Sequence, residues 1–228
     1  MYVKDHMTKN PTTVTKETSV SKALDLMNQG KFHRLPVVDE NNTLIGLITE
    51  GMVSESSGKN STSLSIYELN YLLSRTTVEE IMEKHVHTVK ENIFLEEAAS
   101  VMLEAEISVL PVVDDDNKVV GIITEKDMFQ AFVDLMGYKH QGTKFVISCE
   151  DTPGIFAKAA KLFADNDANL ESCAVYHTEE RGAEVVIKAT GEISVEDMQK
   201  ILEDNGFDLT SIIQTDYDGN KIVYLNKH

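Results

Sequence analysis

The sequence lacks the features that would place it in a membrane or outside the cell. Its apolar runs, such as Val119 to Ile123, are far shorter than the roughly 20 residues that cross a bilayer. The N-terminal residues MYVKDH lack the apolar stretch of a secretory signal. The only two cysteines, Cys149 and Cys173, have no metal-type spacing, so we expect small core residues in a reducing compartment. These absences predict a cytoplasmic protein with no membrane partner.

Basic residues are also scarce. The chain has 21 Lys and Arg against 38 Asp and Glu, a net charge of −17. Such an acidic surface keeps a protein in solution and repels polyanions, so we expect no nucleic-acid partner.

Catalytic and metal-binding motifs are missing as well. No nucleophile with a nearby base, no paired carboxylates and no Gly-rich phosphate loop can be recognised, so we expect no enzyme and no catalytic cofactor. His85 and His87 form a His-x-His pair without the further ligands that a structural metal site needs. We therefore predict no metal site.

The chain does contain a long internal repeat. The phrase HRLPVVDENNTLIGLITE, from His33 to Glu50, returns as SVLPVVDDDNKVVGIITE, from Ser108 to Glu125. The alignment holds without a gap at an offset of 75 residues, from Val3 and Val78 onward. A repeat of this kind decides the architecture before any other signal.

Each copy predicts the order strand, helix, strand, strand, helix. Apolar residues of the first copy fall on one helix face, namely Val20, Ala23, Leu24 and Met27, and so do Leu95, Ala98, Ala99 and Met102 of the second. Thr18 or Ser19 can cap the first helix and Gly30 can end it. The following strands are expected at Leu35 to Asp39 and Leu44 to Thr49, and a further helix begins near Glu50 and Glu125. One copy alone would expose an apolar sheet face, so we expect the two to pack together.

These phrases resemble those of tandem CBS domains, over roughly residues 1 to 136. The family phrase is PVVD followed by G-h-h-T-x-x-D, where h is apolar, and Gly121 to Asp127 fits it completely. The resemblance implies clefts for adenosine ligands, in which Thr124 meets phosphate, Asp127 accepts from the ribose diol and the backbone near Thr88 and Val89 reads adenine. The first copy has Met52 in place of the aspartate, which removes its own ribose contact.

The resemblance also implies that His33 and Arg34 reach a phosphate. The full set of expected nucleotide-binding residues is Thr124, Asp127, Lys126, Thr88, Val89, Ser108, His33, Arg34, Thr49, Thr13 and Val14. Two simpler interpretations stay open. Thr124 and Asp127 also match a helix capping box, a role that can coexist with ligand binding, and Arg34 and Lys126 can be ordinary solvated charges.

The last third follows a different pattern. After Gly137, GYKHQGTK is typical of a linker. Strands are expected at 144–149, 170–177, 183–189 and 207–214, with one helix from Pro153, capped by Asp151 or Thr152, and another from Ser194 to Asn205. This βαββαβ order predicts a ferredoxin-like fold. Beyond it, Ile222 to Leu225 can add an edge strand.

The Asp-Thr-Pro-Gly turn at 151–154 resembles that of ACT domains, which commonly bind amino acids at a dimer interface. The resemblance implies a ligand near Asp151, Gly154 and Asn169. Alternatively, Asp151 only caps a helix and Asn169 only turns the chain.

The expected organisation is a tandem CBS pair followed by an ACT-like domain. The boundaries are residues 1–60 for the first CBS domain, 61–77 for an inter-repeat segment, 78–136 for the second CBS domain, 137–143 for a linker, 144–214 for the ACT-like domain and 215–228 for an unassigned tail. A helix is expected from Ser63 to Ser74, its aromatic side chains packed.

The leading functional hypothesis is a non-catalytic sensor of an AMP, ADP or ATP type ligand, with an ACT domain for a second metabolite or for dimerisation. The domain order resembles that of bacterial acetoin utilization proteins, which implies a role near acetoin metabolism. Family resemblance further implies a homodimer and a regulated enzyme partner. The alternatives are S-adenosylmethionine or NADH as the ligand, or an interaction module with vestigial pockets.

Overall fold

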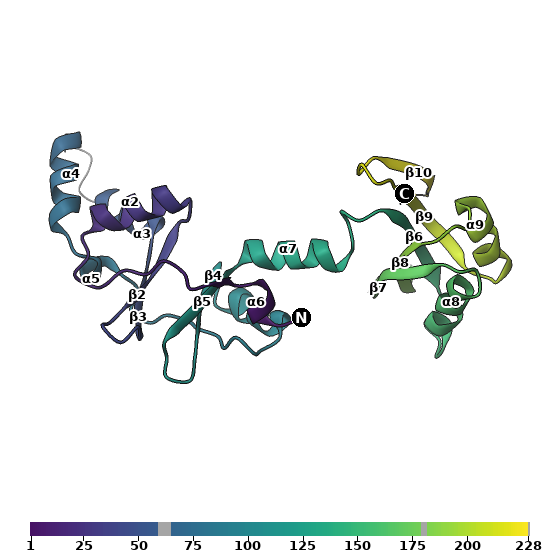
Figure 1. The fold of residues 1–228 in the computed structure, drawn as a ribbon, viewed down its shortest axis with the longest axis horizontal. Coiled ribbons are helices and arrows are strands. Elements are labelled where there is room, and N and C mark those ends of the chain that lie inside the picture. The colour runs from purple at the N-terminus through teal and green to yellow at the C-terminus, as the bar shows by residue number, and fades with distance from the viewer. Residues whose placement is uncertain (59–64, 179–181, 228) are drawn as a thin grey trace. The chain divides into compact units, whose positions relative to one another are not determined.

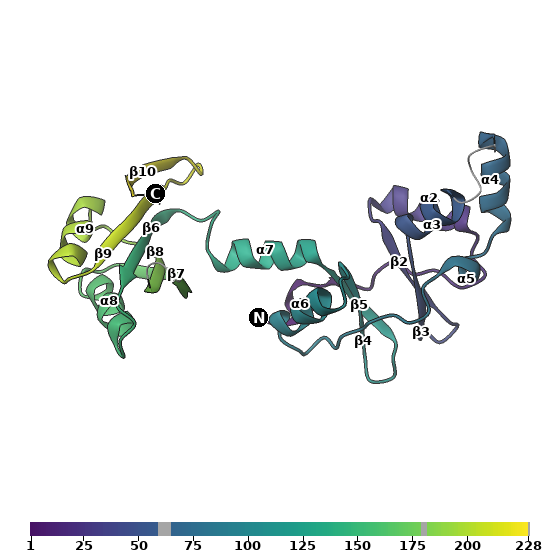
Figure 2. The same ribbon diagram turned by 180° about the vertical axis from the view of Figure 1, so that it is seen from behind.

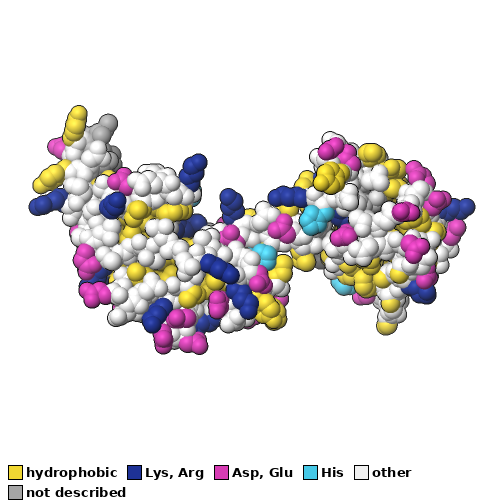
Figure 3. All heavy atoms as spheres, in the orientation of Figure 1, with side chains coloured by type: hydrophobic (Ala, Val, Ile, Leu, Met, Phe, Trp, Pro, Cys, Tyr) yellow, Lys and Arg dark blue, Asp and Glu magenta, His cyan; other side chains and the backbone are white. Residues whose placement is uncertain are grey.

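The computed structural model describes residues 1–58, 65–178 and 182–227. The chain divides into two compact units, Met1–Phe129 and Gln130–His228, each of which is described by itself. On the visible face of each unit, acidic side chains are widely spread and basic side chains are interspersed among them (Figure 3). The net charge of −17 leads one to expect this abundance of acidic groups.

The first unit holds both copies of the repeat. The first copy comprises α1 (Val3–His6), β1 (Thr8–Lys9), α2 (Val20–Gly30), β2 (Arg34–Val38), β3 (Leu44–Thr49) and α3 (Glu50–Gly58). The second copy comprises α5 (Val78–Ile81), α6 (Leu95–Glu104), β4 (Val109–Val113), β5 (Val119–Thr124) and α7 (Glu125–Leu135), and α4 (Ile66–Arg75) precedes it. Figures 1 and 2 show α2 and α3 on the same side of the β2–β3 pair.

Helix α2 forms where the apolar spacing predicts it. Val20, Ala23 and Met27 are fully buried, and the Ser19 hydroxyl caps the helix by accepting from the Lys22 amide at 3.3 Å. The helix also ends at Gly30, as expected. Gly30 is the last helical residue, and it is Lys31 that takes the left-handed conformation, with φ of +54°.

The two copies exchange hydrogen bonds in a two-fold manner. Asn42 and Asn117 both sit at positive φ, and the Leu44 amide donates to the Asn117 carbonyl at 3.0 Å while the Val119 amide donates to the Asn42 carbonyl at 3.1 Å. An apolar cluster of residues from both copies fills the space beside these bonds, namely Val38, Leu44, Val113 and Val119. The predicted packing of the two copies is therefore confirmed.

The predicted opening strand of each copy is reduced to a single bridging residue. Val14 and Val89 each form one parallel bridge, to Val37 and Val112. The segment before it crosses to the other copy, because Thr8 of β1 pairs with Ile122 of β5, and Glu83 correspondingly pairs with Leu47 of β3. Each N-terminal segment thus adds to the sheet of the opposite copy.

Helix α4 differs from the expectation that its aromatic residues pack. Tyr67 is 86% exposed and Tyr71 67% exposed, whereas Leu73 packs against the core of the first copy. The helix is amphipathic, with Ser65 as its N-cap, so its tyrosines occupy the outer face. Residues 63 and 64 and the side chains of Ile66 and Leu69, also part of this prediction, lie outside the described residues.

The second unit is an antiparallel sheet with two helices on one face (Figures 1 and 2). It comprises β6 (Gly142–Cys149), α8 (Ile155–Ala164), β7 (Asn169–Thr178), β8 (Gly182–Thr190), α9 (Val195–Asp204), β9 (Asp208–Thr215) and β10 (Lys221–Asn226). The strand order is β10-β9-β6-β8-β7. Without the edge strand β10, this is the ferredoxin-like arrangement that the βαββαβ order predicts.

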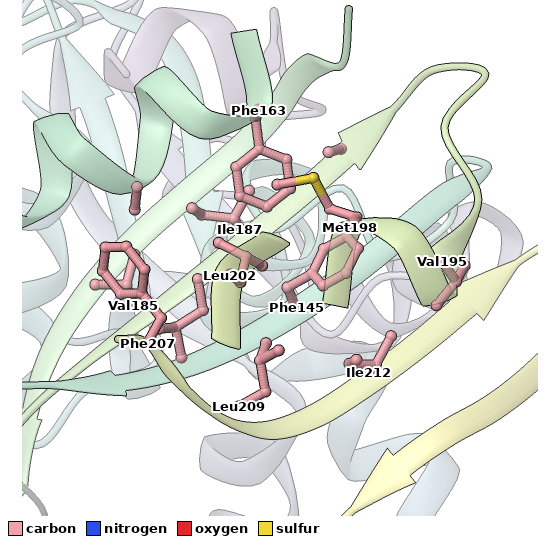
Figure 4. Packing of buried hydrophobic residues seen from close by; sticks show 13 residues of the cluster. Phe145, Phe163, Val185, Ile187, Val195, Met198, Leu202, Phe207, Leu209 and Ile212 are labelled. Atoms are coloured by element: carbon pink, nitrogen blue, oxygen red, sulfur yellow. The ribbon is translucent and has the colours of Figure 1, made fainter. Parts of the chain in front are cut away.

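The core of this unit lies between the sheet and the helices. Figure 4 shows Phe163 of α8 and Met198 of α9 converging with Phe145 of β6, and all three are at most 3% exposed. The prediction of core cysteines is wrong for Cys173, which is exposed on β7, while Cys149 is partly buried. Neither cysteine forms a disulfide.

The turn before α8 also departs from the prediction. The N-cap is Gly154, at φ of +89°, and neither Asp151 nor Thr152 caps the helix. The Asp151 carboxylate instead contacts Nε2 of His177 at 3.1 Å.

Two residues of the predicted linker are hydrogen-bonded to a strand of the sheet. Lys188 of β8 is 3% exposed, and its ammonium donates to the carbonyls of Gly137, at 2.6 Å, and His140. Burial lowers the pKa of this lysine. The carbonyls supply the partners that a buried ammonium requires.

Candidate functional site

Two clefts lie in the first unit, and each is built from both copies of the repeat. We call the larger, of about 610 Å³, the Asp127 cleft. Its lining consists of Thr8, Asn10, Pro11, Thr12, Lys31, Phe32, His33, Arg34, Ser108, Ile122, Thr124, Glu125, Lys126 and Asp127.

We call the other, of about 530 Å³, the Met52 cleft. Its lining consists of His33, Arg34, Leu47, Thr49, Glu50, Gly51, Met52, Glu83, His85, Val86, His87, Glu106, Ile107, Ser108 and Val109. Most of these residues align with lining residues of the Asp127 cleft at the 75-residue offset. The two clefts are therefore the two equivalent sites of a duplicated unit.

In the Asp127 cleft, one carboxylate oxygen of Asp127 accepts hydrogen bonds from the described part of the protein and the other does not. Its Oδ2 accepts from the Thr124 amide at 2.8 Å and from the Thr124 hydroxyl at 2.7 Å. This is the capping-box contact, made by the residue at the third position of α7. Oδ1 has no hydrogen-bond partner among the described residues, so capping and ligand binding can coexist.

In the Met52 cleft, the equivalent start of α3 has a capping hydrogen bond but no carboxylate at the position of Asp127. The Thr49 hydroxyl accepts from the Met52 amide at 3.2 Å. Methionine offers no carboxylate in return, so this copy keeps a capped helix and lacks an acceptor for a ribose diol.

Arg34 lies where the two clefts meet. Its guanidinium donates to the Ser108 hydroxyl, and both residues line both clefts. The adjacent His33 contacts Oε2 of Glu50 through Nδ1 at 2.7 Å. The predicted pair His33 and Arg34 thus reaches the cleft that contains Thr124 and Asp127 of the second copy.

The clefts differ in charge. Lys31, Arg34 and Lys126 line the Asp127 cleft against two carboxylates, Glu125 and Asp127. Glu50, Glu83 and Glu106 line the Met52 cleft, whose only Lys or Arg among the described lining residues is the shared Arg34. With neutral histidines the first cleft suits an anion better than the second does.

The structure brings together most of the predicted nucleotide-binding residues but not all of them. Thr124, Lys126, Asp127, Ser108, His33 and Arg34 line the Asp127 cleft, and Thr49 lines the Met52 cleft. Thr13, Val14, Thr88 and Val89 line neither.

The backbone groups of the two valines take part in bonds within the sheet. The Val89 amide donates to the Pro111 carbonyl, and its own carbonyl accepts from the Val113 amide. Val14 makes the equivalent bonds to Pro36 and Val38. Their amides are therefore unavailable to a base, whereas each carbonyl keeps a second lone pair for a further contact.

Sequence reasoning missed the wall formed by Thr8, Asn10 and Thr12 and the cation of Lys31. The repeat holds the signal for them. At the 75-residue offset these positions align with Glu83, His85, His87 and Glu106, so they differ between copies in polar or charged character. Positions that differ in this way inside a well-kept repeat are candidates for contact with different ligands.

The three residues expected to bind an amino acid are not brought together within one chain. Asp151 and Gly154 follow the end of β6, beside His177 near the end of β7. Asn169 begins β7, opposite Thr190, at the other end of the sheet. Its side chain donates to Glu171 at 2.9 Å.

Among the described residues, no group of three or more His, Cys, Asp or Glu side chains could hold a metal ion. None of the helices formed by these residues is long and apolar enough to cross a membrane.

The CBS domain family matches residues 3–56 and 78–134, and the ACT domain family matches residues 144–207. The chain belongs to the proteins that carry a CBS domain pair with a C-terminal ACT domain.

Solved structures of similar proteins cover the CBS pair. The CBS domain pair of protein MJ0100, in complex with 5′-methylthioadenosine and S-adenosyl-L-methionine, is 32% identical, with a TM-score of 0.50 over 58% of this chain and 99% of that one. CBSX2 of Arabidopsis thaliana in complex with AMP is 31% identical, with a TM-score of 0.50 over 58% of this chain and 97% of that one. An acetoin utilization protein, AcuB, from Vibrio cholerae is 28% identical, with a TM-score of 0.51 over 60% and 93%.

The chain spans less than half the length of the first curated relatives that it matches. Several of those relatives are enzymes, such as homoserine O-acetyltransferase of Methanocorpusculum labreanum, of which it covers 23% at 35% identity. The matched families, CBS and ACT, are regulatory modules.

Proposed function

We propose that the CBS pair is a non-catalytic sensor that binds an adenosine nucleotide of the AMP class in the Asp127 cleft. One observation carries this proposal: three cations and a carboxylate with a free oxygen line a single cleft. Lys31, Arg34 and Lys126 supply the positive charge that a phosphate requires, and Asp127 supplies an acceptor for the ribose hydroxyls. The likeness to CBSX2 in complex with AMP supports the same ligand class.

The test is a calorimetric titration of AMP, ADP and ATP into the wild-type chain and Asp127→Asn. The asparagine keeps an oxygen for the Thr124 amide but loses the second acceptor, so the cap survives and the ribose contact does not. Because a hydrogen bond to a charged group contributes about 1.5–3 kcal/mol, we expect AMP to bind at least about tenfold more weakly. Met52→Ala is the matched control and should leave the affinity unchanged. Equal affinity for AMP in Asp127→Asn would remove Asp127 from the site.

A second candidate ligand is S-adenosylmethionine. The Met52 cleft carries three glutamates and no aspartate at position 52, so it suits a cationic adenosine compound better than an anionic one. The MJ0100 pair, which binds S-adenosyl-L-methionine, supports this alternative. Titration of S-adenosylmethionine and NADH against both variants separates the candidates, since a ligand of the Met52 cleft responds to Met52→Ala and not to Asp127→Asn. No binding of any compound would favour a structural interaction module.

We further propose that the chain regulates an enzyme partner in or near acetoin metabolism, with the ACT domain binding an amino acid or another metabolite or serving dimerisation. The likeness to Vibrio cholerae AcuB supports the metabolic role. A deletion strain complemented with wild type or Asp127→Asn would test it by growth on acetoin. Rescue by wild type alone is expected, and undisturbed growth of the deletion strain would contradict the proposal. The two unpaired cysteines and the acidic surface agree with a cytoplasmic location.

A homodimer is part of the proposed function. Phe129, Phe132 and Leu135 stand at i, i+3 and i+6 of α7 and are each more than half exposed, and exposed apolar clusters commonly mark interfaces. Sedimentation of the full chain should give twice the mass of 25.4 kDa. Phe132→Glu should shift it toward the monomer, and a monomeric wild type would contradict the proposal.

A further inference from the structure

A cavity of about 420 Å³ opens in the second unit, at the end of the sheet far from Gly154. We call it the Thr143 cavity. It lies where β6 begins and β8 and β9 end, and its lining includes Thr143, Gln214, Ala189, Phe145, Phe163 and Met198. A volume of this size falls within the roughly 300–1,000 Å³ of small-molecule sites.

The register of the strands explains why the cavity exists. Thr143 of β6 pairs with Ala189 of β8 on one side and with Gln214 of β9 on the other. Residues that are directly opposite share a face of the sheet, and Thr143 is two residues from the buried Phe145, so this row faces the helices. This row carries a hydroxyl, a methyl and an amide group, from Thr143, Ala189 and Gln214, where the next one, Phe145 with Ile187 and Ile212, is large and apolar.

The helices leave this end row uncovered. Helix α8 ends at Ala164 and α9 begins at Val195. Phe163 and Met198, near these two helix ends, therefore form the inner wall of the cavity. Figure 4 shows both side chains above Phe145. The cavity therefore has an apolar interior wall and a polar floor.

The polar groups of the floor are available to a ligand. Thr143 is 8% exposed, and its hydroxyl has no hydrogen-bond partner among the described residues. Every fully buried polar side-chain atom in the described part of the chain does have a partner, so this hydroxyl must reach open space, and the space it lines is the cavity. The Gln214 carbonyl accepts from the Tyr224 hydroxyl at 3.0 Å, which leaves the amide nitrogen of Gln214 for a second contact.

The charges of the lining restrict the kind of ligand. None of the described lining residues is Lys, Arg or His, and the single carboxylate is that of Asp216. Both of its oxygens accept hydrogen bonds from Asn220, at 2.8 and 2.9 Å, which lower the pKa of Asp216 and keep it ionised. An anion would meet this carboxylate with no cation to offset it.

We propose that the Thr143 cavity is a binding site for a small uncharged metabolite. A hydroxyl or carbonyl group of the ligand would contact Thr143 and Gln214, and its apolar part would pack against Phe145, Phe163 and Met198. This site shares no lining residue with the Asp127 cleft, and its proposed ligand is uncharged whereas that of the Asp127 cleft is anionic.

The test uses the full chain labelled with ¹³C at the methionine methyl groups and benzyl alcohol as the probe. We expect the Met198 methyl signal, assigned with Met198→Leu, to shift saturably in the millimolar range. Benzoate, which has the same ring and a negative charge, should bind at least tenfold more weakly. No saturable shift of the Met198 signal, or tighter binding of benzylammonium than of benzyl alcohol, would overturn the proposal.

Two variants locate the probe. Ala189→Leu fills the cavity and should abolish the shift, while Thr143→Val removes only the hydroxyl and should weaken binding about three- to tenfold. Both should bind AMP as the wild type does, and if Ala189→Leu does not fold, Thr143→Val carries the test. Asp151→Asn, at the other end of the sheet, should change nothing. Loss of the shift in Asp151→Asn, or its persistence in folded Ala189→Leu, would place the probe elsewhere and refute the site.

Discussion

The Asp127 and Met52 clefts are equivalent positions of one repeat, yet they differ in charge and in hydrogen-bonding capacity. Lys31 and Lys126, which line only the first cleft, align with Glu106 and Gly51, which line only the second. The more negative charge of the second cleft comes from these side chains and from Glu83, which aligns with Thr8. Duplication has preserved the fold in both copies and allowed their binding surfaces to diverge.

The preserved residues have structural reasons that the diverged ones lack. A Cβ atom on Gly46 would lie 2.6 Å from the sulfur of Met82, and one on Gly121 would meet the sulfur of Met7. Met7 and Met82 are themselves equivalent in the repeat, and each packs against the sheet of the opposite copy. Glycine at these two positions leaves room for the methionine side chains of the exchanged N-terminal segments, which a larger residue would displace.

The largest expected effect on AMP binding is that of Arg34→Ala, which removes the cation at the junction of the two clefts. Arg34 carries the partly buried cation that both clefts share, and a charge-assisted hydrogen bond contributes about 1.5–3 kcal/mol. AMP affinity, measured by calorimetry, should fall about 10- to 100-fold. Arg34→Lys keeps the charge but not the planar donor geometry and should give an intermediate loss. If AMP binds Arg34→Ala as tightly as wild type, its phosphate does not lie at the junction of the clefts.

The difference can also be erased by giving the Met52 cleft the missing groups. In the double variant Gly51→Lys and Met52→Asp, the first copy regains both a cation and a ribose acceptor. The space allows it, because a Cβ on Gly51 would lie no closer than 3.6 Å to the Thr49 hydroxyl. The AMP stoichiometry should rise from one to two per chain, with the new site within about tenfold of the original affinity. Gly51→Lys alone is the control, and a stoichiometry that stays at one in the double variant would show that other residues decide.

Reversing the charge of Lys31 alone should show how much one lysine contributes to the difference between the two clefts. Lys31→Glu makes the Asp127 cleft resemble the other at this position, where the repeat has Glu106. Since exposed charges interact by about 0.2–1 kcal/mol, a reversal should weaken AMP binding about three- to tenfold. The loss should shrink at 1 M salt, where the screening length is about 3 Å. Glu106→Lys, the matched change in the Met52 cleft, should leave this site unaffected. A loss of equal size at low and high salt would mean that Lys31 acts by contact and not by charge.

Much of the fold could be predicted from the sequence because it follows from local patterns. The gapless repeat required two packed copies, and the apolar spacing from Val20 to Met27 gave α2. What failed depends on contacts distant in the sequence. The pairing of Thr8 with Ile122, which shapes one wall of the Asp127 cleft, leaves no periodic signal in its own segment.

The candidate site was only partly predictable for the same reason. The phrase from Gly121 to Asp127 identified the helix start that carries Asp127. Val14 and Val89 are predicted to read a base, and sheet pairing already uses their backbone amides, which leaves a lone pair of each carbonyl for that contact. The exposed tyrosines of α4 show an error, since an aromatic residue on an amphipathic helix need not face the core of its own chain. Only the structure shows which backbone groups and faces remain free.

The smallest expected effect separates capping from binding. Thr49 and Thr124 each precede a helix, but Thr49 lies outside the Asp127 cleft, and its hydroxyl caps α3 by accepting from the Met52 amide. Thr49→Ala should lower the free energy of unfolding by about 1 kcal/mol, measured by denaturant titration, with AMP affinity unchanged. Thr124→Ala should show a similar loss of stability together with weaker AMP binding, because its hydroxyl also faces the Asp127 cleft. Weaker AMP binding in Thr49→Ala would instead place the nucleotide in the Met52 cleft, where the three glutamates would have to be offset by Arg34 alone.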